Sequence, residues 1–115
     1  MAEPIPGNLR VSNDVIADLA GYAALECYGV VGMAYTDAQE NIVRLLSLGS
    51  LRKGIDVAVE DGRVKVDLHT VLEQGVNMAS VSRNLESAVR FTLKELAEIE
   101  NVDVTVHVED LRTHK

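Results

Sequence analysis

The sequence is poor in the residues from which many kinds of functional site are built. It contains one cysteine, which excludes an internal disulfide and any cysteine-cluster metal site. No window reaches the ~18 consecutive apolar residues that a membrane-spanning helix needs. The first residues, Met1 to Pro4, include neither a basic region nor a long apolar run, so they do not form a signal peptide. These absences predict a cytoplasmic protein without direct membrane insertion.

Positive charge is also scarce. The chain has 11 Lys+Arg against 18 Asp+Glu, which gives a formal net charge of -7. Phosphate binding needs a concentrated basic surface, so this balance argues against nucleic acid as the main partner. The composition, 47% hydrophobic and 25% charged over 115 residues, is typical of one soluble globular domain. We expect a flexible arm at residues 1–7, a single domain at 8–111 and a tail at 112–115.

The first half of the chain predicts a strand and a helix. Residues 8–12 alternate between polar and apolar, and Ser12 then precedes apolar residues at helical spacing that continue to about Cys27. Cys27 lies on this apolar stripe, which indicates a structural thiol. The pattern over residues 30–53 is ambiguous, and a short helix over residues 39–46 is one interpretation.

The second half is better specified. Residues 55–60 and 63–72 alternate as two strands joined by Asp61-Gly62, a strong hairpin signal because both turn positions need positive φ. The two-residue turn fixes the register and places Asp56 opposite Asp67. A long amphipathic helix over about residues 76–99 and a strand over 102–109 follow.

This order of elements predicts an α+β fold. The expected architecture is a two-layer sandwich, with a small, mostly antiparallel sheet and two main helices on one face. The sequence leaves the strand order open between a ferredoxin-like split β-α-β arrangement and a KH-like one.

Four segments carry a resemblance to a known family. They are Val11 to Ala20 with Gly29 to Met33, Lys53 to Val57, Glu73 to Met78, and Val102 to Glu109. In this order they resemble the alkaline shock protein family, the envelope stress response family of Gram-positive bacteria, over about residues 8–111. The chain lacks the long charged extensions of the better-known members, so it resembles a compact member.

The resemblance implies a non-enzymatic cytoplasmic protein connected with cell-envelope stress. Family members can self-associate and can be held at the membrane by small membrane-anchored partner proteins. No catalytic residue or cofactor is established for the family, so the resemblance implies none here.

The residues themselves offer one candidate site. Asp56 and Asp67 face each other on the polar side of the hairpin, where like charges destabilise a sheet. His69 lies on the same face, and His107 lies on the equivalent face of the last strand. The four could form a divalent-metal or acid–base site if the two histidine strands are neighbours. The alternative is a solvated face on which Lys65 neutralises the acidic pair.

Two further features favour contact with other proteins. The segment 44–53 is locally basic and leucine-rich, and the strand at 55–60 could expose an open edge. Phe91 lies off the apolar stripe of the long helix. The predicted interaction residues are Arg44, Leu48, Leu51, Arg52, Lys53 and Phe91.

The leading hypothesis is therefore a self-associating, non-enzymatic interaction module that acts in the envelope stress response or envelope homeostasis. Its partners would be copies of itself, a membrane-anchored protein or a kinase. One alternative is a regulatory partner of a metabolic kinase of the lipid or dihydroxyacetone type. Another is a small metal-dependent enzyme that uses the Asp56/Asp67 face. KH-like nucleic-acid binding conflicts with the charge.

Overall fold

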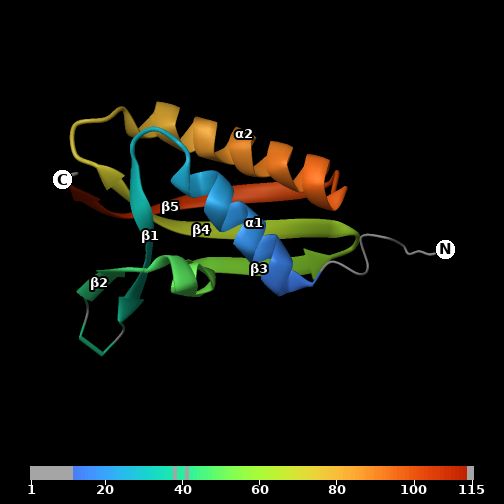
Figure 1. Cartoon of the computed structure of the whole chain (residues 1–115), viewed down its shortest axis with the longest axis horizontal. Helices are drawn as coiled ribbons and strands as arrows, with labels where there is room; N and C mark the ends of the chain where they lie inside the picture. Colours follow the sequence, from blue (N-terminus) through green and yellow to red (C-terminus); the bar gives the residue numbers. More distant parts are fainter. Residues whose placement is uncertain (1–11, 38, 41, 114–115) are drawn as a thin grey trace.

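The computed structural model describes residues 12–37, 39–40 and 42–113 (Figure 1). The arm predicted at residues 1–7 and nearly all of the strand predicted at 8–12 lie outside the described residues, as do residues 114–115 of the tail. The described residues form helices, strands and one 3-10 segment. In chain order these are α1 (Asn13–Leu25), β1 (Val30–Asp37), β2 (Ile42–Leu45), η2 (Leu48–Gly54), β3 (Ile55–Glu60), β4 (Arg63–Glu73), α2 (Met78–Ala97) and β5 (Val102–Arg112).

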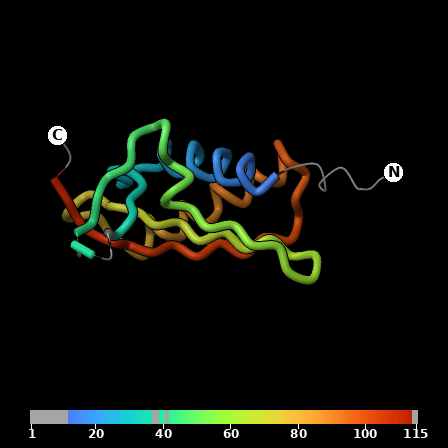
Figure 2. The backbone as a smooth tube through the Cα atoms, turned by 90° about the horizontal axis from the view of Figure 1, so that it is seen from below, coloured from blue at the N-terminus to red at the C-terminus, as the bar shows by residue number. Residues whose placement is uncertain are grey.

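The elements form two layers. Figure 2 shows α1 and α2 on one side of the sheet, while no helix of the described residues covers the other side. The predicted α+β sandwich, with its two main helices on one face of the sheet, is confirmed.

Strand β4 is the centre of the sheet. It pairs antiparallel with β3 and β1 along one edge and parallel with β5 along the other. The hairpin register is as predicted, with Val57 opposite Val66 and Asp56 opposite Asp67. Both turn residues have positive φ, at 52° for Asp61 and 79° for Gly62. β4 and β5 pair directly, without the intervening strand of a split β-α-β unit.

The ambiguous segment 30–53 supplies two strands and a 3-10 turn. The short helix predicted over residues 39–46 is wrong, because Ile42–Leu45 forms β2 and pairs antiparallel with β1. The β-branched Ile42 and Val43 favour the extended form. The amide of Leu46 extends this pairing with a 2.8 Å hydrogen bond to the carbonyl of Met33.

The hydrophobic core lies between the helices and the sheet. β4 contributes Val66 and Leu68, and α2 contributes Leu85, Val89 and Leu93, all of them almost fully buried. These side chains recur at every second residue in the strand and every fourth in the helix. The predicted stripe of the long helix included Leu96, which is 69% exposed, and the buried position is Leu93 instead.

Helix α1 approaches the sheet closely because its buried face is made largely of small residues. Ser12 caps the helix by accepting a hydrogen bond from the amide of Val15 at 3.2 Å. At Gly21 an added Cβ would lie 3.1 Å from Cδ1 of Ile55, so the helix packs tightly here because this position has no side chain.

Cys27 follows α1 and is half-buried. Its sulfur lies 3.5 Å from the carbonyl oxygen of Ala23. Burial raises the pKa of the Cys27 thiol, and the nearby Glu26 raises it further. The thiolate is the reactive form of cysteine, so this environment suits the structural role predicted for it.

We predict that Gly54→Ala destabilises the fold by about 1–3 kcal/mol, because the new methyl group would lie 2.7 Å from the backbone oxygen of Ala34. Gly49→Ala, in the same η2 segment, is the matched control, since its added methyl group meets nothing within 4 Å. Urea unfolding of both variants measures the difference. Equal stability of the two would contradict the tight packing of η2 against β1.

Candidate functional site

The four residues predicted as a candidate site come together on the open face of the sheet. Asp56 lies in β3, Asp67 and His69 lie in β4, and His107 lies in β5. The register places Asp56 opposite Asp67 and His69 opposite His107. The condition that the two histidine strands be neighbours is therefore met.

The two imidazole rings stack on each other. Their centroids are 4.6 Å apart and their planes differ by 12°. Nε2 of His107 lies 3.0 Å from Oδ1 of Asp67. Nε2 of His69 lies 3.1 Å from Oδ2 of Asp56, and its Nδ1 lies 2.7 Å from Oε2 of Glu109. We call these five residues the histidine cluster.

Glu109 was not predicted to belong to this site. It follows His107 by two residues and therefore shares its face of the strand. A register shift in the β4–β5 pairing follows at this point, where Thr70 opposes Val108 and Val71 opposes Asp110. Alternation along β5 could have indicated the face, but the contact with His69 depends on this irregularity.

The cluster favours a proton on His69. Burial opposes the charged form and would lower the pKa of this imidazole, but the hydrogen bonds to Glu109 and Asp56 outweigh burial and raise the pKa of His69 above its ordinary 6.5. A ring whose two nitrogens both face carboxylate oxygens must carry both protons to donate to each. Geometry and electrostatics therefore agree on the charged form.

Lysine does not neutralise the facing carboxylates. Lys65, expected to reach the Asp56–Asp67 pair, instead lies 3.0 Å from Glu60. Each aspartate of the pair contacts a histidine of the neighbouring strand. The expected solvated face is thus a network of histidine–carboxylate contacts.

The cluster is not arranged as a metal centre. Within residues 12–37, 39–40 and 42–113, no group of three or more His, Cys, Asp or Glu side chains is placed to hold a metal ion. Its nitrogen and oxygen atoms hydrogen-bond to one another, and the side chains of His69 and His107 are 28% and 41% exposed. What this arrangement can do chemically is bind and release a proton.

The basic segment at 44–53 is largely neutralised by carboxylates of the same chain. Arg44 forms an ion pair with Glu40. Arg52 donates two hydrogen bonds of 2.8 Å to Asp18 of α1, and this pairing lowers the pKa of the Asp18 carboxyl. The positive charge on which the predicted docking role of this segment depended is therefore already compensated at both arginines.

The apolar residues predicted for docking divide into buried and exposed. Leu51 is 4% exposed and belongs to the core, which corrects its assignment to a docking surface. Leu48 and Phe91 are 67% and 66% exposed. Lys53 is exposed as well. The sequence left open whether Phe91 packs against α1, and the structure places its side chain at the surface.

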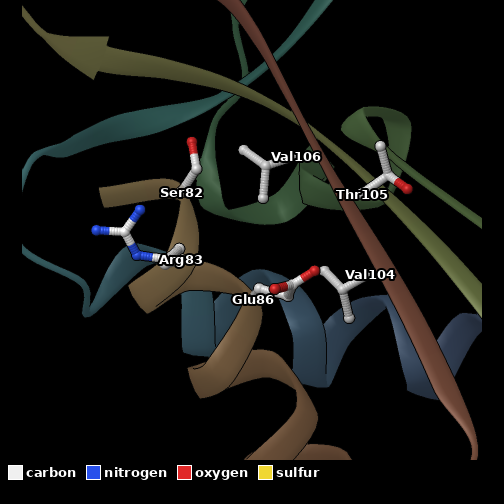
Figure 3. A pocket seen from close by; sticks show the side chains of 6 residues that line it. All are labelled: Ser82, Arg83, Glu86, Val104, Thr105 and Val106. Carbon is white, nitrogen blue, oxygen red and sulfur yellow. The ribbon is translucent and has the colours of Figure 1, made fainter. Parts of the chain in front are cut away.

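A shallow groove of about 260 Å³ lies between α2 and β5 (Figure 3). Its walls are Ser82, Arg83 and Glu86 from the helix and Val104, Thr105 and Val106 from the strand. No sequence motif indicated this groove, because it depends on β5 lying at the end of the sheet beneath α2.

Residues 2–113 match the model of the alkaline shock protein family, which is described as having a "cell envelope-related function". The chain belongs to the alkaline shock protein family. This confirms the resemblance on which the sequence interpretation rested.

Named relatives support the same assignment. The chain is 36% identical over 107 residues to the uncharacterized protein Spy1614 of Streptococcus pyogenes, covering 92% of this chain and 88% of the relative. It is 28% identical over 107 residues to the uncharacterized protein YloU of Bacillus subtilis, covering 92% and 89%. It is 26% identical over 113 residues to the stress response regulator gls24 homolog of S. pyogenes, covering 98% and 63%. No solved structure matches the chain.

The two α-helices described in this alkaline shock family chain, α1 and α2, both belong to the two-layer sandwich. None of the helices in the described residues has the length and apolar character needed to cross a membrane.

We predict that the histidine cluster makes stability depend on pH. The raised pKa of His69 means that its contribution is fully present below about pH 6.5 and is lost as the pH rises through the folded-state pKa. Urea unfolding from about pH 6 to about pH 9 should show a decline in the wild type that His69→Gln lacks.

The carboxylate partner gives a sharper measurement. Glu109→Gln should lower the pKa of His69, read from the NMR shifts of its ring. Glu60→Gln, in β3 but paired with Lys65, should leave that pKa unchanged. An unchanged pKa in Glu109→Gln would refute the cluster.

Proposed function

We propose that this chain is a non-enzymatic, self-associating protein-interaction module that acts in the cell-envelope stress response or in envelope homeostasis. Its place of action would be the cytoplasm, where a membrane-anchored partner protein could hold it at the envelope. The family description and the names of the stress-response relatives support the cellular setting. The interaction role rests on the surface of the molecule.

One observation carries the interaction role. Phe91 is the only phenylalanine in the chain, and 66% of it is exposed on α2. Phenylalanine is usually buried in cores, and aromatic side chains are enriched at protein interfaces. The described core is filled by aliphatic residues instead, so Phe91 is available to a partner.

Leu96 provides a matched position on the same helix. It is 69% exposed, similar to Phe91, but it lies five residues further along α2, which is about 140° around the helix axis. The two residues therefore face different directions. A partner that docks on one of them need not contact the other.

We predict that a photo-crosslinking amino acid at position 91 captures a defined protein in the native cell, more strongly under envelope stress. The same amino acid at position 96 is the control. Phe91→Ser should abolish partner capture while changing the free energy of unfolding by less than about 0.5 kcal/mol, since the side chain is exposed. Equal capture at both positions would contradict the docking role of Phe91.

A further inference from the structure

Strand β3 has one paired edge and one open edge. Its inner edge pairs with β4, and no strand of the described chain pairs with its outer edge. Proteins usually protect such edges with proline, lysine or a bulge, because unpaired backbone groups can pair with another strand. β3 contains neither proline nor lysine, and its pairing with β4 is regular throughout.

The hairpin turn defines which backbone groups of β3 face outward. The residues that flank this two-residue turn, Glu60 and Arg63, form a hydrogen-bonded pair. Because successive residues direct their backbone groups to opposite edges, the odd-numbered residues of β3 face outward. Ile55 follows this rule, since its amide donates to a carbonyl of η2 and not to β4. The outward groups of Val57 and Val59 are left, and no strand among the described residues pairs with them.

Apolar side chains lose their cover along the same part of β3. Its odd-numbered side chains point toward the helices, and Ile55, which packs against Gly21 of α1, is 5% exposed. Val57 is half-buried, and Val59 is 58% exposed. In the first turn of α1, Val15 is 45% exposed. The second half of β3 therefore has both an open backbone edge and an uncovered apolar side.

Helix α1 begins at this border of the sheet. Arg52, which lies just before β3, forms ion pairs with Asp14 and Asp18 of α1. Figure 1 shows the first turn of α1, in dark blue, over β3 and short of the hairpin end. The N-cap residue Ser12 has an extended backbone, with φ of -71° and ψ of 160°. The chain therefore enters α1 in an extended conformation, next to β3.

The residues that precede Ser12 have the pattern of a strand. Residues 8–11, Asn-Leu-Arg-Val, alternate between polar and apolar, and they lie outside the described residues. Four residues in a strand span about 13 Å, so a strand formed by them lies close to the start of α1. The outer edge of β3 is the open edge beside that start.

We propose that residues 8–11 form a strand that pairs antiparallel with the outer edge of β3. The direction follows from the free half of β3, because η2 occupies its beginning and α1 starts short of its end. Val11 pairs with Val57, and Leu9 pairs with Val59, each pair exchanging two backbone hydrogen bonds. This proposal is independent of the proposed function.

The side chains fit this register. Leu9 and Val11 lie on the helix side, where they cover Val59. Arg10 lies on the open face opposite Ala58, whose small side chain leaves room for it. A shift by one residue would place both apolar side chains on the open face and Arg10 beneath α1, because neighbouring residues of a strand point to opposite faces.

Covalent attachment favours this occupant over a strand of another chain. A segment tethered by a short connection has an effective concentration on the order of millimolar at a site within its reach. A strand from a second copy or from a partner protein has to compete with this value. The edge is therefore closed within one chain, which also protects it from pairing with others.

Disulfide formation tests the register. Arg10 and Ala58 form a non-hydrogen-bonded antiparallel pair, in which Cα atoms are about 4.5 Å apart and within the range of a disulfide. Arg10→Cys with Ala58→Cys, in a Cys27→Ser background, should form an intramolecular disulfide under mild oxidation. Arg10→Cys with Thr105→Cys is the matched control, since Thr105 is also exposed but lies in β5.

Hydrogen exchange tests the pairing without a new covalent bond. The amides of Val57 and Val59 should exchange at least about tenfold more slowly in the wild type than in Val11→Pro, which lacks the N–H that bonds to β3. Arg10→Pro is the control, because the N–H of Arg10 points away from β3 and its loss should leave this protection unchanged. Circular dichroism should show the same folded domain in both variants.

The outcomes separate this occupant from the others. A disulfide within one chain between positions 10 and 58, but not between 10 and 105, supports the pairing. A disulfide that joins two chains assigns the edge to the segment of a second copy and overturns pairing within the chain. Amides of Val57 and Val59 that exchange as fast in the wild type as in Val11→Pro overturn the pairing altogether.

Discussion

The molecule depends on the pairing of β4 with three other strands. Leu68 is paired with Ile55 of β3 on one side and with Val106 of β5 on the other. The same residue is fully buried in the core beneath the helices. Because β4 is eleven residues long, it has room for β3 at one end and β1 at the other along the same edge. The helices, the groove and the histidine cluster all take their positions from this strand.

Local patterns predicted the parts of the fold that short-range contacts determine. Asp61-Gly62 determined the hairpin register because a two-residue turn allows one pairing, and the periodicity of α2 reflects a face that is buried along its length. β1 and β2 were missed for a physical reason. Gly32 interrupts the apolar run of β1 at a point where the pairing with β4 is irregular. An added Cβ there would lie 3.2 Å from Leu45, so the glycine serves packing between strands that the local sequence does not reveal.

The candidate site, like the fold, was predicted from the sequence only where local patterns determine it. The facing of Asp56 and Asp67 follows from the turn, and alternation along each strand placed His69 and His107 on the open face. Their contact required the parallel pairing of β4 and β5, which is set by the path of α2 across the sheet and not by either strand alone. Glu109 required one step more, since an irregularity in that pairing lies beside it.

The histidine cluster accounts for an arrangement that would otherwise be unfavourable. Two carboxylates opposite each other in a sheet repel. Here each of them reaches a histidine on the next strand, and the stacked rings then connect β3, β4 and β5 across the face opposite α1 and α2. A network that satisfies its own hydrogen-bonding groups needs no ligand to explain it. An apolar surface with an unmet physical demand lies elsewhere, at the exposed ring of Phe91, and it is suited to a partner with an apolar surface of its own.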